Sequence, residues 1–146
     1  MTAQAIKIKK LHPSAQKPHY ATDGAGCFDL YGVAEAEIPP MFAATVSTGL
    51  AFEIPEGHAM LIFSRSGHGF KHGVRLSNAV GVIDADFRGT VAVRLHNDGG
   101  TPFVIEAGER IAQGLIVKAD RHSFEWVDAL SDTERGEGGF GSTGRT

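Results

Sequence analysis

Alternation of apolar and polar side chains is the main pattern along this chain. In Ile6–Lys9 and again in Val91–Leu95, every second residue is apolar. Side chains of a β-strand point alternately to its two faces, so a period of two predicts half-buried strands. Short runs rich in β-branched and aromatic residues predict further strands at Phe42–Val46, Ala51–Ile54, Met60–Phe63, Ile111–Val117 and Phe124–Val127.

Turn residues separate these runs and leave little room for helices. Clusters of Pro, Gly, Asp and Glu occur at Pro39–Pro40, Pro55–Gly57, Asp98–Gly100 and Ala107–Glu109. No segment keeps an apolar stripe with a 3.6-residue period over three turns, and at most one helical turn fits, near Gly69–His72. The pattern therefore predicts an all-β fold, a jelly-roll-like antiparallel β barrel or sandwich.

The last sixteen residues differ from the rest of the chain. They include five glycines, show no alternation, and carry Phe140 as their only large apolar side chain. We therefore expect a β domain over residues 1–130 and a flexible glycine-rich tail over residues 131–146. A second interpretation stays open, because backbone N–H groups and the hydroxyls of Ser142 and Thr143 are suited to bind phosphate oxygens.

Composition narrows the classes of function. The 146 residues carry a net charge of −3, which gives no basic surface for a nucleic-acid duplex. Cys27 is the only cysteine, which excludes an internal disulfide and favours a reducing compartment. The chain contains neither a signal-peptide pattern nor an apolar run long enough to span a membrane. We expect a cytoplasmic protein with no nucleic-acid or membrane partner.

Two segments contain candidate chemistry. Asp84 follows the apolar pair Val82–Ile83, and we expect its carboxylate to be partly desolvated, which would favour a general base. The segment Gly81–Asn97 around it predicts a β-hairpin, and a simple turn role for Asp84 stays open. Arg65–Gly67 combines an arginine, which binds phosphate oxygens in bidentate fashion, with a glycine that allows close approach of a ligand.

The glycines of Gly136–Thr143 resemble a Walker phosphate-binding loop only in part. Ser142 stands where that motif requires lysine, and the segment does not connect a strand to a helix. We therefore exclude a Walker-type nucleoside triphosphatase.

Five segments follow one another along the chain: GAGCFDL (24–30), SRSGHGFKHG (64–73), GVIDADFRG (81–89), GERIAQ (108–113) and RGEGGFGSTG (135–144). Together, in this order and spacing, they resemble the five motifs of the trimeric dUTPase family. The resemblance implies a homotrimer of jelly-roll subunits whose sites are shared between chains. It also implies Mg²⁺-dependent hydrolysis of dUTP to dUMP and pyrophosphate.

The same resemblance implies roles for individual residues of the β domain. Asp84 matches the aspartate that activates the attacking water, and Asp29 matches the residue that reaches Mg²⁺ through water. Phe87 matches the ring beneath the deoxyribose. The phosphate-binding residues implied are Arg65, Ser66, Gly67 and Gln113, and the uracil-binding residues are Asn78, Val82, Ile83 and Ala92.

The tail also receives implied roles. Phe140 matches the aromatic residue that stacks on uracil when the tail closes over a neighbouring subunit's site. The tail residues implied in substrate binding with it are Arg135, Gly141, Ser142 and Thr143.

Some positions depart from the family pattern. Phe87 replaces a tyrosine, Ser64 and His68 replace a proline and a leucine, and Thr90 replaces a common glutamate. A dCTP deaminase, which shares this fold, needs a glutamate on the strand after Gly89, where this chain has Arg94. A regulatory nucleotide-binding protein is the remaining alternative.

Overall fold

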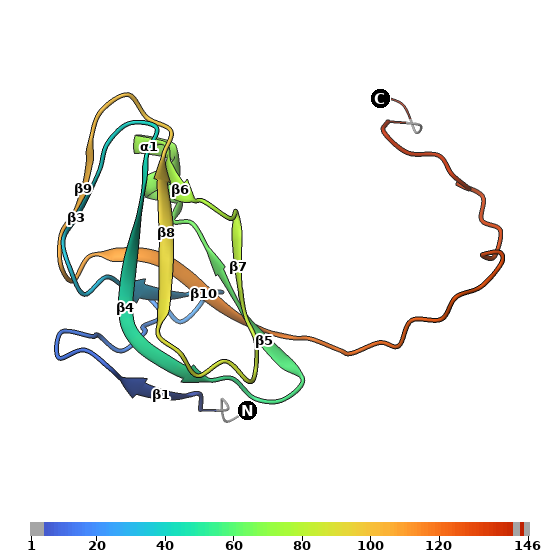
Figure 1. Cartoon of the computed structure of the whole chain (residues 1–146), viewed down its shortest axis with the longest axis horizontal. Coiled ribbons are helices and arrows are strands. Elements are labelled where there is room, and N and C mark those ends of the chain that lie inside the picture. Colours follow the sequence, from blue (N-terminus) through green and yellow to red (C-terminus); the bar gives the residue numbers. More distant parts are fainter. Residues whose placement is uncertain (1–4, 142–143, 145–146) are drawn as a thin grey trace.

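The computed structural model describes residues 5–141 and residue 144, and within them the regular secondary structure consists of β-strands and one short helix (Figure 1). All the strand pairs are antiparallel, as the alternation predicted. The elements are β1 (Lys7–Lys10), β2 (Phe28–Tyr31), β3 (Ala36–Ile38), β4 (Ala43–Glu53), β5 (His58–Phe63), α1 (Ser66–His72), β6 (Val74–Leu76), β7 (Val80–Ile83), β8 (Val91–Asn97), β9 (Phe103–Ile105) and β10 (Arg110–Lys118).

Two four-stranded sheets form the body of the molecule. One has the order β1-β4-β8-β6 and the other β2-β10-β5-β7, while β3 and β9 form a separate pair. Buried side chains from both large sheets make one hydrophobic cluster, so the core lies between the sheets as in a β-sandwich. Its largest fully buried members include Leu30, Met60, Ile62, Leu76, Leu95 and Ile111.

Strand β8 shows how the alternation becomes packing. Val91, Val93 and Leu95 are buried, whereas Ala92 and Arg94 between them are exposed. The buried Asn97 ends the strand, and its amide nitrogen donates to the carbonyls of Ile38 and Thr101, both at 2.8 Å. A buried amide is tolerated because these bonds satisfy it.

Strand β4 unites two runs that the sequence suggested as separate strands. Its register against β8 shifts between Ser47 and Leu50, and Gly49 between them has a φ of +63°. Such a bulge interrupts the alternation without ending the strand. The buried hydroxyl of Thr48 donates to the Val91 carbonyl at 2.7 Å and ties the bulge to the neighbouring strand.

The prediction of a β-hairpin over Gly81–Asn97 is wrong. Strand β7 pairs with β5, and β8 pairs with β4 and β6, so the loop between β7 and β8 crosses from one sheet to the other. Alternation within each strand was read correctly, but alternation does not specify the partner strand.

Two further expectations need correction. The helix spans Ser66–His72, more than the single turn expected, and Gly73 ends it in the left-handed conformation at a φ of 67°. The sequence pattern did not predict the full helix, because its glycines carry no side chain that could form part of an apolar stripe. Phe124–Val127 forms no strand, since this described segment has no pairing partner within the chain.

Beyond β10 the chain leaves the body and extends away from it (Figure 1). Described residues 119–141 contain no strand or helix, and their large apolar side chains are strongly exposed, among them Trp126, Leu130 and Phe140. In the described part of the chain, no helix is both long and apolar enough to cross a membrane.

Candidate functional site

The pairing of β2, β10 and β5 brings three of the motifs together. Asp29 on β2 lies opposite Gln113 on β10, and Gln113 in turn lies opposite Phe63 on β5. Directly after β5, the Ser64 carbonyl accepts a hydrogen bond of 3.1 Å from the Gln113 side-chain nitrogen. Segments far apart in the sequence thus meet at one place, which we call the Arg65 cluster (Asp29, Arg65, Ser66 and Gln113).

Arg65 precedes helix α1 and is half-buried. One guanidinium nitrogen, Nη1, donates to the Arg110 carbonyl at 3.3 Å and lies 3.3 Å from Nε2 of His68. Together with Ser66 and Gln113, Arg65 lines an open cavity of about 400 Å³. A cation, a hydroxyl and a side-chain amide around one opening are suited to bind an anionic group.

Gly67 lies in the first turn of α1 beside this cavity but does not line it. A Cβ atom added there would meet nothing within 4 Å, so the backbone at Gly67 faces open space. For the predicted contact with Gly67, a substrate would have to extend beyond the cavity that Arg65, Ser66 and Gln113 line.

Asp29 is the most enclosed acidic candidate, with a side chain only 14% exposed. Its Oδ2 accepts a hydrogen bond of 3.3 Å from the Arg110 guanidinium, a partner that the sequence did not reveal. The two residues are 81 positions apart, and only the β2–β10 pairing joins them. Among residues 5–141 and 144, no group of three or more His, Cys, Asp and Glu side chains is placed to hold a metal ion.

A second cavity, of about 380 Å³, is lined by the residues that the resemblance assigns to uracil binding. Its wall is formed by the turn after β6 and by the facing parts of β7 and β8. Ala79 in that turn has a φ of 61°, an uncommon conformation for a residue with a side chain. All four predicted uracil-binding residues line this Asn78 cavity: Asn78, Val82, Ile83 and Ala92.

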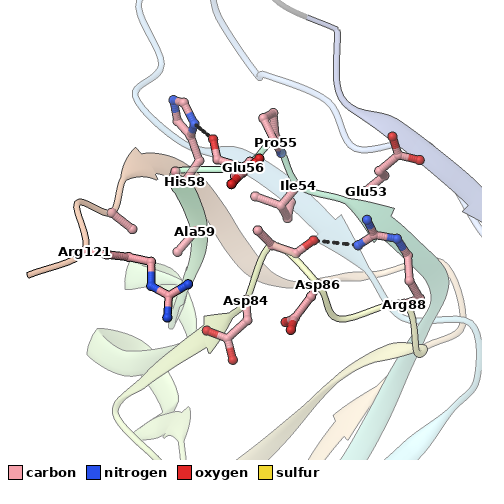
Figure 2. Close-up of a pocket in the computed structure, with 13 residues that line it drawn as sticks. Glu53, Ile54, Pro55, Glu56, His58, Ala59, Asp84, Asp86, Arg88 and Arg121 are labelled. Carbon is pink, nitrogen blue, oxygen red and sulfur yellow. Dashed lines mark hydrogen bonds between the residues drawn. The ribbon is translucent and has the colours of Figure 1, made fainter.

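Asp84 begins the loop after β7 and lines a third cavity, of about 760 Å³. Figure 2 shows its carboxylate directed into the same space as the Arg121 guanidinium, with Asp86 between Asp84 and Arg88. Arg88 stabilises this loop, because its Nη1 donates to the Ala85 carbonyl at 2.6 Å (Figure 2). Sequence reasoning assigned no role to Arg88 or Arg121, which no motif spacing connects to Asp84.

The expected partial desolvation of Asp84 is wrong for the single chain. The residue is exposed, because it leaves the apolar strand β7 and faces the wide Asp84 cavity. Any desolvation has to come from a ligand or another chain.

Phe87 lies in the same loop and is 42% exposed. A Cβ atom added to Gly89 would lie 2.6 Å from the Phe87 ring, so the ring covers this glycine closely. The absence of a side chain at Gly89 thus leaves room for the tip of the Phe87 ring.

The three cavities share no lining residue in the described part of the chain. The tail is a fourth, separate element: Arg135 bonds only within it, donating from Nε to the Gly138 carbonyl at 2.9 Å. Phe140 and Gly141 lie far from the body in the extended tail, and Ser142 and Thr143 lie outside the described residues. One chain alone does not bring the predicted site residues into one pocket.

Known proteins match this chain over nearly its whole length. The family model named dUTPase matches residues 14–144. A deoxyuridine 5'-triphosphate nucleotidohydrolase of Wolinella succinogenes is 46% identical, covering 97% of this chain and 95% of that protein. One of Nautilia profundicola is also 46% identical, covering 96% and 99%.

Solved structures agree with these sequence matches. The dUTPase of Staphylococcus bacteriophage 80alpha, in a mutant form with dUpNHpp, superimposes with a TM-score of 0.91 and 27% identity, covering 98% of this chain and 100% of that chain. A mutant dUTPase of phage phi11, described with a structural Mg(II) ion, has a TM-score of 0.81 at 21% identity, covering 87% of this chain and 99% of that chain. At this identity the match supports the fold alone. From its sequence and its fold, this chain belongs to the dUTPase family.

Proposed function

We propose that this protein hydrolyses dUTP to dUMP and pyrophosphate. The observation that carries the proposal is the grouping of the family's motif residues into separate sites of suitable chemistry. A cationic and polar cluster suits the phosphates, an open cavity lined by parts of β7 and β8 suits the base, and a carboxylate faces open space for the attacking water. The reaction limits uracil in DNA and supplies dUMP, and we place it in the cytoplasm.

Asp84 is the proposed general base. Its carboxylate orients a water molecule in line with the leaving pyrophosphate and accepts the proton as the water attacks the α-phosphorus. The new bond joins the water oxygen to that phosphorus, and the bond to the bridging oxygen breaks. The protein's task in such a transfer is mainly to position the groups and stabilise charge.

Arg65, Ser66 and Gln113 are the proposed phosphate-binding residues of the β domain, with Gly67 providing backbone approach. Their common cavity supports this assignment for the first three. Arginine contributes a fixed positive charge and paired donors, which stabilise the charge on the departing pyrophosphate.

Mg²⁺ is the proposed cofactor. It usually keeps several waters and is bound by one or two carboxylates together with substrate phosphates, so a cage of protein ligands is not required. Asp29 fits that role, because it lies opposite Gln113, one of the proposed phosphate-binding residues. Arg110 holds one of its carboxylate oxygens in place. When bound, the ion would neutralise charge on the phosphates, and Asp29 would hold one of its waters.

The proposed working form is a homotrimer. Separation of the three cavities supports a site completed by other chains, and so does the tail that extends away from the body. In this proposal a β domain over residues 1–130 is followed by a tail over residues 131–146. Phe140, Arg135 and Gly141, with Ser142 and Thr143, would close over a neighbour's site, while Phe87 packs beneath the deoxyribose.

One experiment separates this reaction from the deaminase alternative. Arg94 stands at the position where the deaminase requires a glutamate, and its guanidinium donates to the Thr45 hydroxyl at 3.5 Å. We expect the protein with Mg²⁺ to release pyrophosphate from dUTP and little from dTTP, dCTP or UTP. Ammonia release from dCTP, or comparable turnover of two of these nucleotides, would refute the proposal.

A further inference from the structure

Helix α1 buries a histidine next to the Arg65 cluster. His68 is only 6% exposed, and its ring packs edge-on against Phe103 with the ring centroids 5.0 Å apart. A leucine, the usual residue of the family motif at this position, would fill such an apolar place without cost. An imidazole instead brings two polar nitrogens into the interior, which is unfavourable unless they are bonded.

One of these nitrogens lies close both to Arg65 and to a residue of a second motif. Nε2 of His68 lies 3.3 Å from Nη1 of Arg65 and 3.3 Å from Oε1 of Glu109. The other carboxylate oxygen of Glu109 accepts a hydrogen bond of 3.0 Å from the backbone N–H of Glu106. The Glu109 carbonyl also accepts from the backbone N–H of Gly32 at 2.9 Å, so the turn that carries Glu109 is firmly held.

The neutral ring suits this position. When Nε2 carries the hydrogen it donates to Glu109, and when Nδ1 carries it the lone pair of Nε2 accepts from Arg65, so the ring makes one of these two bonds at a time. The buried Nδ1 has no hydrogen-bond partner among the described residues. Burial lowers the pKa of His68 below its usual value, and the nearby charge of Arg65 lowers the same pKa further. The ring is therefore uncharged at neutral pH and does not repel the guanidinium.

We propose that His68 is a positioning residue: the lone pair of its Nε2 accepts a hydrogen bond from the Arg65 guanidinium and holds that group at the phosphate cavity. The inference rests on the proposed function, because it assigns Arg65 to the phosphates of the substrate. Without the imidazole, the Arg110 carbonyl is the only remaining partner described for Arg65. The side chain would then sample more rotamers, and binding would require it to be ordered again.

Three variants test this proposal. His68→Leu keeps the apolar packing and removes the polar link, whereas His68→Gln keeps a hydrogen-bonding group. His72→Leu is the matched control, because exposed His72 lies on the same helix and packs on the same Phe103 ring, with centroids 5.0 Å apart. In the described residues, no hydrogen bond or ion pair joins His72 to Arg65 or Glu109.

We expect His68→Leu to lower kcat/KM for dUTP about tenfold, mainly through KM, because Arg65 already contacts the phosphates in the ground state. His68→Gln should recover most of that loss, and His72→Leu should match the wild type. The melting temperature of His68→Leu should not fall. As the pH falls through the lowered pKa of His68, the ring gains a positive charge beside Arg65 and His72, with Glu109 opposing, and its Nε2 can no longer accept from Arg65. Wild-type affinity for dUTP should then weaken, and His68→Leu should lose this pH dependence.

Wild-type kcat/KM in His68→Leu would overturn the proposal. Equal losses in His68→Leu and His68→Gln, with lowered melting temperatures, would also overturn it, because they would show a packing role. A wild-type protein that does not hydrolyse dUTP would refute the proposed function instead. In that case the affinity for inorganic triphosphate, measured by calorimetry, still decides: a weaker affinity in His68→Leu alone supports the positioning of Arg65, and equal affinities refute it.

Discussion

The Arg65 cluster and the C-terminal tail both carry residues suited to bind phosphates, but only the cluster is held in place by its own chain. Gln113 bonds to the Ser64 carbonyl, Arg65 to the Arg110 carbonyl, and Asp29 to the Arg110 side chain. Described tail residues bond only among themselves, and the Phe140 side chain is fully exposed. The comparison teaches that one part of the proposed site is already held in place by its own chain, whereas the other part would have to be ordered by a ligand or another chain.

Asp84→Asn should produce the largest effect on the reaction. The amide keeps the shape of the side chain but cannot accept the proton of the attacking water, so kcat should fall by about 10²–10⁴-fold while dUTP affinity stays nearly unchanged. Steady-state kinetics and binding of a non-hydrolysable analogue measure the two quantities. Turnover within a few-fold of wild type would return Asp84 to a turn role.

Deletion of the tail from Arg135 onward should separate catalysis from stability. Little core is lost, since the described tail contacts nothing in the body, so the melting temperature and the oligomer should be retained. Loss of a few charge-assisted phosphate contacts and of the stacking ring should lower kcat roughly 10- to 100-fold, at least as strongly as it raises KM. Arg65→Ala is the variant to compare with this truncation, because it removes one phosphate contact from the Arg65 cluster, which its own chain holds in place.

Two results would contradict the tail's proposed role. A truncated protein that dissociates into monomers in gel filtration would make the tail a structural clasp. Full activity after truncation would make it a disordered end without a role in the reaction.

Phe87→Ala should have a smaller effect, confined to sugar selection. The ring packs on Gly89 and is partly exposed, so its removal opens space beside the sugar with little loss of core. The ratio of kcat/KM for dUTP to that for UTP should fall about tenfold, at the lower end of the roughly 10- to 200-fold that a small apolar contact contributes to selectivity. An unchanged ratio would place sugar selection at another residue.

Local sequence patterns predicted the strands well and their partners poorly. The alternation of Val91–Asn97 reports directly on burial, because each side chain of β8 faces either the core or solvent. It does not report which strand lies alongside, and so the hairpin of β7 and β8 was a wrong prediction. Gly49 divided β4 into two apparent strands, and the run Phe124–Val127 has β-forming composition but no partner in its own chain.

The site residues were accessible from the sequence only through their joint resemblance to a family. Asn78, Val82, Ile83 and Ala92 do line one cavity, yet no local pattern connects Asn78 with Ala92. The hydrogen bond from Arg110 to Asp29 could not be predicted locally, because the two residues are 81 positions apart and meet only through the pairing of β2 with β10.

The central claim, that each site is completed by several chains, is tested most directly by mixing two inactive variants. Asp84→Asn and Arg65→Ala subunits, each with little activity alone, are unfolded together, refolded and assayed for pyrophosphate release from dUTP. If Asp84 and Arg65 of one site come from different chains, random mixing leaves about a quarter of the sites with both residues intact, and activity returns. Arg65→Ala mixed with Gln113→Ala is the control: both residues belong to the Arg65 cluster of one chain, so every site keeps one lesion. Recovery in the first mixture alone is the predicted result, and no recovery in the first mixture would contradict the account.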